Sequence, residues 1–360
     1  MKYRLLPHIQ PFVFYLFLTA LFALSACLQE EKKVSPDELK AAMQTEPDSV
    51  TYVLRTAESY FLQRDYPKAR ESYQQLQKQS GSEVYRQYAE QQIALCDEKI
   101  KEMPKQPEEK KPEPPTLDWW NGLDNDWKDY FRADVFKGEA TQKEVNRIFN
   151  EMLLLNLSHK PITNIEPLRP LVRMRAIEIA GTKVNSLEPI AEHKRLWVLR
   201  ASNTQITDLQ PIANLTKLGE VQLAYTPVTS LEPMKNLIDM NYLNVNGTKI
   251  TNIDALSGMH TMTHLDISDT RVASLEPIKN IGAMEELLCS NTPITSLEPI
   301  AKLGLLKMLV INGTRVTSLA PLANLKNLEK LYCKGIPVGR EEVMQFMAQH
   351  PMCEVISDYN

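Results

Sequence analysis

Residues 196–217 read LWVLRASNTQITDLQPIANLTK, and the next 22 residues, 218–239, read LGEVQLAYTPVTSLEPMKNLID. The same 22-residue unit begins nine times between positions 152 and 328, without insertion or deletion, on the consensus L-x-x-L-x-L-x-x-T-x-[IV]-[TN]-x-[LI]-x-P-[LI]-x-x-L-x-x. Position 16 is proline in every full unit except one, which has Ala255. A fixed period of this length predicts a solenoid, in which identical short coils stack along one axis.

Each unit carries about seven apolar positions that it cannot cover alone. Stacking brings every apolar residue onto its copy in the next unit and forms one continuous core. The first six positions predict a short strand, and eight to nine strands at about 4.8 Å spacing give a parallel sheet about 40 Å long. Proline has no amide hydrogen for a ladder, so the proline side is expected to be 3₁₀ or extended structure. The strand side is predicted to be concave and the proline side convex.

This region resembles the leucine-rich repeat family, in particular the 22-residue repeats of bacterial internalins. The resemblance implies an α/β solenoid: a leucine-rich repeat coil of eight to nine units at residues 152–338, with a helical N-terminal cap at 118–151 and an α/β C-terminal cap at 339–360. One position departs from the family pattern, because position 9 is threonine from Thr182 to Thr314 where the family has asparagine. We expect the same coil with different hydrogen bonds in its turn.

The start of the chain has the pattern of a secretory signal. Lys2 and Arg4 precede an apolar run, residues 11–24, which is followed by Leu-Ser-Ala-Cys at 24–27. The run is shorter than the roughly 20 residues that a membrane span needs. The last four residues resemble a bacterial lipobox, which implies a signal peptide at 1–26, cleavage before Cys27 and lipid attachment to Cys27. Leu28 then favours an outer-membrane lipoprotein, with its periplasmic or cell-surface orientation left open.

Three further segments separate the lipid anchor from the repeats. Residues 27–35 are expected to form a tether, and residues 104–117 a proline- and charge-rich linker that is extended at about 3.1 Å per residue. Residues 36–103 predict a small all-α segment that resembles one tetratricopeptide repeat plus a further helix at 84–100. Two interpretations of this segment remain open, a peptide-docking groove and a helical spacer or self-associating hairpin. The resemblance rests on the spacing of Ala57, Tyr60, Tyr66, Ala69, Tyr73 and Leu76.

Both ends of the coil carry helix signals. Thr141 and Glu144 have the spacing of a capping box, and Val145, Ile148 and Phe149 follow at helical spacing, so this helix is expected to cover the first repeat. At the other end, residues 340–349 predict a helix after Gly339, and residues 353–356 a closing strand.

The sequence offers little that points to catalysis. The five cysteines form no paired framework; Cys289 and Cys333 lie two units apart, too far for a disulfide, while a Cys333–Cys353 pair remains open. No metal-ligand cluster, phosphate loop or nucleophile motif is found, so we expect no enzyme, no metal and no cofactor. The net charge of −4 argues against nucleic-acid binding.

Positions 3 and 5 of each unit are expected to face outward on the concave side. This face is polar and acidic in its middle and apolar toward its C-terminal end. Two accounts of the apolar end remain open: an interaction surface, or a surface covered by the C-terminal cap. We predict that a protein partner, of unknown identity, binds Tyr242, His264, Asp266, Glu286, Leu288, Met308, Val310 and Tyr332.

The sequence therefore predicts a lipid-anchored extracytoplasmic scaffold that binds a protein through the concave face. An alternative is a component of an outer-membrane assembly or transport complex that docks through residues 36–103. A second alternative, a hydrolase built on His264 and Asp266, is disfavoured because these side chains lie on an open sheet.

Overall fold

The computed structural model describes residues 34–35, 38–39, 42, 50, 53–54, 57–58, 60–61, 66–102, 112–135 and 140–359. It divides into two compact units, residues 1–109 and 110–360, and each is described by itself. The predicted signal peptide, Cys27, most of the tether and residues 104–111 of the linker lie outside the described residues. Among the helices that the structure describes, none combines the length and the apolar composition that a bilayer crossing requires.

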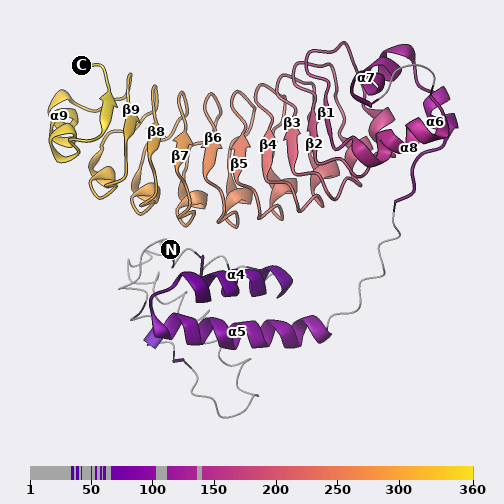
Figure 1. The fold of residues 1–360 in the computed structure, drawn as a ribbon. Helices are drawn as coiled ribbons and strands as arrows, with labels where there is room; N and C mark the ends of the chain where they lie inside the picture. The colour runs from indigo at the N-terminus through magenta and orange to yellow at the C-terminus, as the bar shows by residue number, and fades with distance from the viewer. Residues whose placement is uncertain are drawn as a thin grey trace, which may run out of the picture. The chain divides into compact units, whose positions relative to one another are not determined.

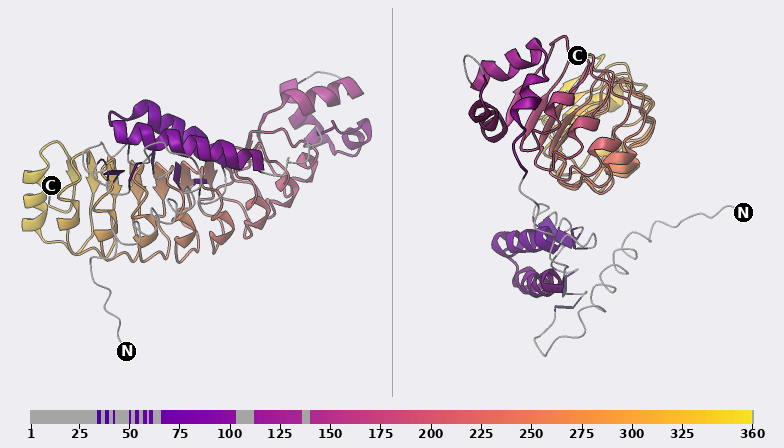
Figure 2. Two further views of the ribbon diagram at one scale, coloured as in Figure 1. Left: turned by 90° about the horizontal axis from the view of Figure 1, so that it is seen from below. Right: turned by 90° about the vertical axis from the view of Figure 1, so that its right-hand side faces the viewer.

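The first unit contains a helical hairpin of α4 (Tyr66–Gln79) and α5 (Glu83–Glu102). The two helices lie side by side (Figures 1 and 2). Tyr73 of α4 meets Tyr88 of α5 edge to face, with ring centroids 6.2 Å apart. Arg70 Nε also lies 2.6 Å from Asp97 Oδ1. The expected all-α character of this segment is confirmed where residues are described, and its likeness to a tetratricopeptide repeat stays a prediction.

The second unit is built on a ten-stranded parallel sheet in which the strands follow one another in chain order (Figure 1). Neighbouring strands pair with a shift of 22 residues throughout the repeats, as in Leu155 opposite Ile177 and Leu243 opposite Leu265. The strands are β1 Leu154–Asn156, β2 Ala176–Glu178, β3 Val198–Arg200, β4 Glu220–Gln222, β5 Tyr242–Asn244, β6 His264–Asp266, β7 Glu286–Leu288, β8 Met308–Val310, β9 Lys330–Tyr332 and β10 Glu354–Ile356.

The proline side of each of the eight full units forms a single 3₁₀ turn, as predicted. Proline fits the first turn of such a helix because the amide hydrogen that it lacks would have no partner there. The turn also forms at Ala255, so it does not depend on proline alone. The 3₁₀ turns are η1 Glu166–Leu168, η2 Glu188–Ile190, η3 Gln210–Ile212, η4 Glu232–Met234, η5 Asp254–Leu256, η6 Glu276–Ile278, η7 Glu298–Ile300 and η8 Ala320–Leu322.

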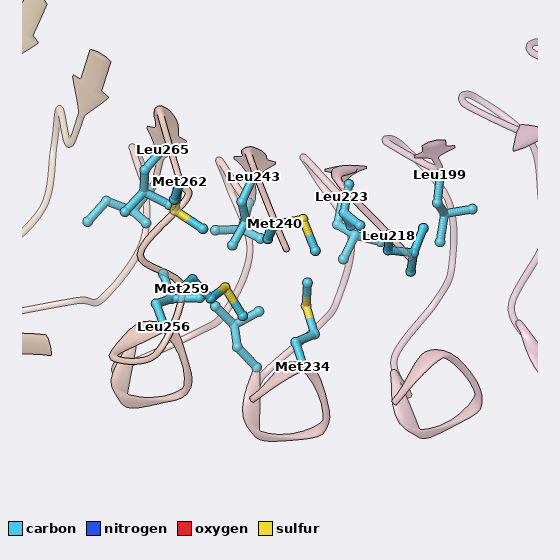
Figure 3. Packing of buried hydrophobic residues seen from close by; sticks show 14 of the residues in the cluster. Leu199, Leu218, Leu223, Met234, Met240, Leu243, Leu256, Met259, Met262 and Leu265 are labelled. Carbon is cyan, nitrogen blue, oxygen red and sulfur yellow. The ribbon is translucent and has the colours of Figure 1, made fainter. Parts of the chain in front are cut away.

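One continuous apolar core runs between the strands and the 3₁₀ turns, from Trp120 to Val355. Figure 3 shows part of it, where Leu243 and Met240 lie in one layer with Met234 below them. The eleventh-position residues Ile206, Val228 and Ile250 are all fully buried in it. Burying one such side chain stabilises the fold by about 1.5–3 kcal/mol, so stacking is the main source of stability.

The threonines at position 9 supply the different turn bonding that the sequence predicts. Each donates its hydroxyl hydrogen to the backbone carbonyl three residues earlier, for example Thr182 Oγ1 to Ile179 O at 2.7 Å and Thr248 Oγ1 to Val245 O at 2.7 Å. All seven of these threonines are buried, so this hydrogen bond satisfies a hydroxyl that has lost contact with water.

Both predicted caps are present. The N-terminal cap consists of α6 (Leu117–Asn121), α7 (Asn125–Val135) and α8 (Gln142–Glu151). The capping box of Thr141 and Glu144 begins α8, which buries Val145, Ile148 and Phe149 against the first repeat. The C-terminal cap consists of α9 (Arg340–Gln349) and β10.

The register of β10 answers the open question about Cys333 and Cys353. Glu354 pairs with Lys330 and Ile356 with Tyr332, so Cys353 aligns with Glu329, four residues before Cys333. Four strand residues span about 13 Å, which is too far for a disulfide. Both thiols are free and buried, and burial raises the pKa of each to about 11.

Candidate partner-binding face

The first and third residues of each strand point away from the core, and we call the surface that they form the strand face. The central residue of each strand is buried, whereas its two neighbours are half-buried or exposed in most units. Because the register never slips, equivalent positions of successive units lie next to one another. The structure thus brings all eight predicted partner-binding residues onto one continuous surface, and their role in binding stays a prediction.

Three of these residues form a contact chain across β5, β6 and β7. The Tyr242 and His264 rings stack with centroids 5.7 Å apart and an interplanar angle of 30°. His264 Nε2 lies 3.6 Å from Glu286 Oε1, and its Nδ1 lies 2.8 Å from the hydroxyl of Thr263. These contacts fix the imidazole in one orientation, so the three side chains present a preformed aromatic and acidic surface.

Asp266 has a structural role that sequence reasoning did not foresee. Its Oδ1 accepts a hydrogen bond from the backbone N–H of Ser268 at 2.9 Å. Asn244 holds the backbone of Asn246 in the same way at 3.0 Å. Asp266 therefore stabilises the turn after β6 and leaves one carboxylate oxygen for a partner. Across the residues that the structure describes, no three acidic, histidine or cysteine side chains gather as a metal site would require.

The apolar end of the strand face is continuous with this chain of contacts. Leu288, Val310 and Tyr332 are adjacent in register on β7, β8 and β9, and Met308 lies at the other outward position of β8. All four are half-buried, so the apolar surface is less exposed than the sequence analysis assumed.

The C-terminal cap extends the strand face. Strand β10 pairs beside β9, which places Ile356 next to Tyr332. The helix α9 is held at the opposite side of the coil, where Glu342 accepts hydrogen bonds from the Ser318 hydroxyl at 2.7 Å and the Leu319 amide at 2.6 Å, just before η8. These contacts hold α9 away from the apolar end, and the role of that end as an interaction surface stays a prediction.

The N-terminal half of the strand face carries an ion-pair network. Arg200 on β3 donates from Nη1 to Glu178 Oε1 at 2.6 Å and from Nε to Glu220 Oε1 at 2.7 Å. Its hydrogen bonds to Glu220, together with both carboxylate charges, raise the pKa of Arg200 above its ordinary value. Gln222 donates to the same Glu220 oxygen at 2.9 Å. The single guanidinium neutralises one of the two carboxylates, so one negative charge remains between β2 and β4.

Sequence reasoning missed two large exposed aromatic residues, Trp197 and Tyr225. It considered positions 3 and 5 only, whereas Trp197 occupies position 2 and Tyr225 position 8 of their units. Position 8 has a positive φ in every unit, so a bulky tyrosine at this position is unusual. This is the signal that could have identified Tyr225. The residues there are His159, Gly181, Asn203, Tyr225, Gly247, Asp269, Asn291, Gly313 and Gly335.

Comparison with known proteins identifies the fold. No family model and no curated protein sequence matches this chain. The structure is similar to internalin C2 from Listeria monocytogenes, with a TM-score of 0.55 and 22% identity over 58% of this chain and 93% of that chain. A leucine-rich repeat protein of Leptospira interrogans gives a TM-score of 0.55 and 22% identity over 61% of this chain and 57% of that chain.

The functional domain of InlJ from Listeria monocytogenes gives the same TM-score of 0.55, with 15% identity over 69% of this chain and 63% of that chain. At these identities the likeness establishes the fold alone. The second unit is a leucine-rich repeat solenoid with a helical N-terminal cap, and the predicted fold class is confirmed.

Proposed function

We propose that this protein is a lipid-anchored extracytoplasmic scaffold that captures a protein partner on the strand face of its leucine-rich repeat solenoid. The observation that carries the proposal is the unbroken row of Tyr242, His264 and Glu286, which runs directly into the apolar end at Met308. Tyrosine and methionine side chains are enriched at the centre of protein interfaces, and a charged group such as Glu286 fits the polar rim around them.

The shape of the face favours a macromolecule over a small ligand. Small-molecule sites are concave pockets that bury most of the ligand surface. The predicted residues instead lie along five strands, which at about 4.8 Å spacing extend over about 20 Å. A stable protein interface covers about 800 Å² on each partner, and a broad sheet surface can supply such an area.

The same contacts disfavour a hydrolase at this position. A general base needs a ring nitrogen within reach of the proton that it removes. His264 has Thr263 and Glu286 within reach, but the Thr263 hydroxyl already donates to the backbone carbonyl of Asn241 at 3.1 Å, and Asp266 is held by the backbone of Ser268. The open sheet also lacks the enclosed pocket from which an enzyme excludes water. We infer that these residues bind a partner and do not carry out catalysis.

The proposed location rests on sequence features at the start of the chain. Cys27 follows Leu-Ser-Ala, which supports lipid attachment, and the acyl chains of a bacterial lipoprotein would anchor the chain stably. The proline-rich linker then gives the repeats reach away from the outer membrane.

Partner capture from intact cells tests the proposal. Tyr242→Glu and Met308→Glu each place a charge in the proposed interface and are expected to weaken capture at least about tenfold, since hot-spot truncations often cost 2 kcal/mol or more. Leu154→Glu is the matched control, because Leu154 is an exposed outward residue of β1 on the same sheet. Unchanged capture by both interface variants would show that the partner binds elsewhere.

A further inference from the structure

Two aromatic side chains in the N-terminal half of the solenoid are exposed to solvent to an unusual degree. Trp197 is 52% exposed and Tyr225 is 58% exposed, and neither belongs to the partner-binding set. Trp197 directly precedes β3, whereas Tyr225 follows β4. They therefore lie on opposite borders of the strand face. Trp197 is at position 2 and Tyr225 at position 8 of their units, and six residues of extended chain span about 20 Å.

Each ring is seated on a glycine of the next unit. A Cβ atom on Gly219 would lie 2.3 Å from Trp197 Nε1, and a Cβ atom on Gly247 would lie 2.5 Å from Tyr225 Cδ1. Neither ring could keep its place beside any other residue type. The glycines thus support one side of each ring and leave the other side open to solvent.

Tyr225 also keeps an unfavourable backbone conformation. Its φ is 55°, in the left-handed region, where a bulky residue costs about 1–3 kcal/mol. Seven of the nine residues at this position are glycine, asparagine or aspartate, which tolerate the conformation better. Strain of this kind is concentrated at binding sites, where the position of the side chain matters more than the lost stability.

A fixed polar surface connects the two rings. Arg200 is held between Glu178 and Glu220, and Gln222 is held by Glu220. These planar side chains retain unused donors on Arg200 and Gln222 and unused acceptor capacity on the carboxylates. Because one carboxylate charge remains unneutralised, the surface disfavours anions and suits an uncharged ligand that both donates and accepts hydrogen bonds.

We propose that this part of the strand face binds a neutral oligosaccharide, with Trp197 and Tyr225 stacking on sugar rings and Arg200, Glu220 and Gln222 bonding to hydroxyl groups. A sugar ring has a flat C–H face that packs on an aromatic ring, and its hydroxyl groups both donate and accept. A protein ligand fits less well, because aromatic anchors of protein interfaces are usually enclosed in a desolvated pocket. The site adjoins the proposed protein-binding surface, since Glu220 lies beside Tyr242 in register, but the two share no residue.

Affinity electrophoresis of the full chain in gels that contain laminarin, xylan, dextran or galactomannan tests the site. At least one polysaccharide is expected to retard the wild-type protein. Trp197→Ala and Tyr225→Asn are each expected to weaken retardation about tenfold, the range of a lost stacking contact. Tyr225→Asn suits the left-handed backbone, so the variant should fold with unchanged or higher thermal stability. Tyr225→Phe keeps the ring and should keep the binding.

The controls separate this site from a general loss of structure and from the protein-binding surface. Met352→Ala removes another exposed apolar side chain and should bind as wild type does. Met308→Glu should lose protein capture and retain polysaccharide binding. The proposal is overturned if no gel retards the wild-type protein, or if Tyr225→Asn is retarded as strongly as wild type. The proposal is also overturned if no polysaccharide gel retards the protein while a peptide binds it in a way that requires both Trp197 and Tyr225.

Discussion

Replacing His193 with leucine should stabilise the solenoid, most strongly in mild acid. His193 occupies position 20, where the other full units have leucine, isoleucine or methionine. The residue is fully buried, and among the described residues neither ring nitrogen has a hydrogen-bond partner. Burial lowers its pKa to about 4, and the nearby carbonyl groups of Leu168 and Ile190 offset only part of that effect.

The lowered pKa makes stability depend on pH. In the unfolded chain the imidazole has a pKa of about 6.5, so between pH 6.5 and 4 the unfolded state binds a proton that the folded state does not. Titration of His193 therefore costs the folded state nothing above pH 6.5. As the pH falls from 6.5 toward 4, protonation of the unfolded chain lowers the free energy of unfolding. At pH 4.5 this lost free energy amounts to about 2.5 kcal/mol. At pH 7.5 the leucine variant should already gain about 1–3 kcal/mol, because it removes an unsatisfied buried polar group.

Urea unfolding followed by circular dichroism at pH 7.5 and pH 4.5 measures both effects. The difference in free energy of unfolding between His193→Leu and wild type should widen by about 2–3 kcal/mol at the lower pH. The carboxylates contribute equally to the pH dependence of both proteins, so their contribution cancels in the difference between the two free energies of unfolding. His159→Asn, at an exposed position with φ of 62°, is the control and should leave the pH dependence unchanged. An equal difference at both pH values would refute the reasoning.

Further predictions concern the turn, the helical segment and the anchor. Thr248→Val should lower the free energy of unfolding by about 1 kcal/mol in urea, because it removes the hydrogen bond to Val245; no change would mean that the hydroxyl is not needed. Gly247→Ala should cost about 1–3 kcal/mol at a φ of 65°, with partial recovery in the double variant with Tyr225→Asn; additive effects would exclude contact between the two sites. Deletion of residues 36–103 should leave partner capture intact, whereas loss of membership in a membrane complex would favour docking through the helical segment. Cys27→Ser should move the protein from the membrane to the soluble fraction on cell fractionation, and unchanged membrane association would argue against the lipid anchor.

The 22-residue period made most of the solenoid predictable. Since no unit contains an insertion, the strand register, the buried central residues and the outward rows all follow from one alignment of the sequence with itself. The same logic located the 3₁₀ turns, because proline at position 16 excludes a strand there. The C-terminal cap has no repeat, so the separation of Cys333 from Cys353 became evident only from the pairing of β10.

The features that were missed do not depend on hydropathy. Position 8 is occupied by glycine, asparagine, aspartate, histidine or tyrosine. These residues have the same backbone conformation here but differ in polarity, so hydropathy does not mark the position. Tyr225 therefore looked like an ordinary turn residue. The contacts of His264 with Tyr242 and Glu286 depend on side-chain rotamers, which the sequence pattern does not specify. Sequence reasoning thus located the strand face and left its local chemistry undetermined.

Site-specific photocrosslinking on intact cells tests the central claim most directly. A photoreactive amino acid at Tyr242 lies on the strand face, whereas one at Lys235 follows η4 on the opposite side of the preceding unit. We predict a discrete crosslinked protein adduct from position 242 and none from position 235. An adduct from position 235 alone, or from neither position, would contradict binding through the strand face.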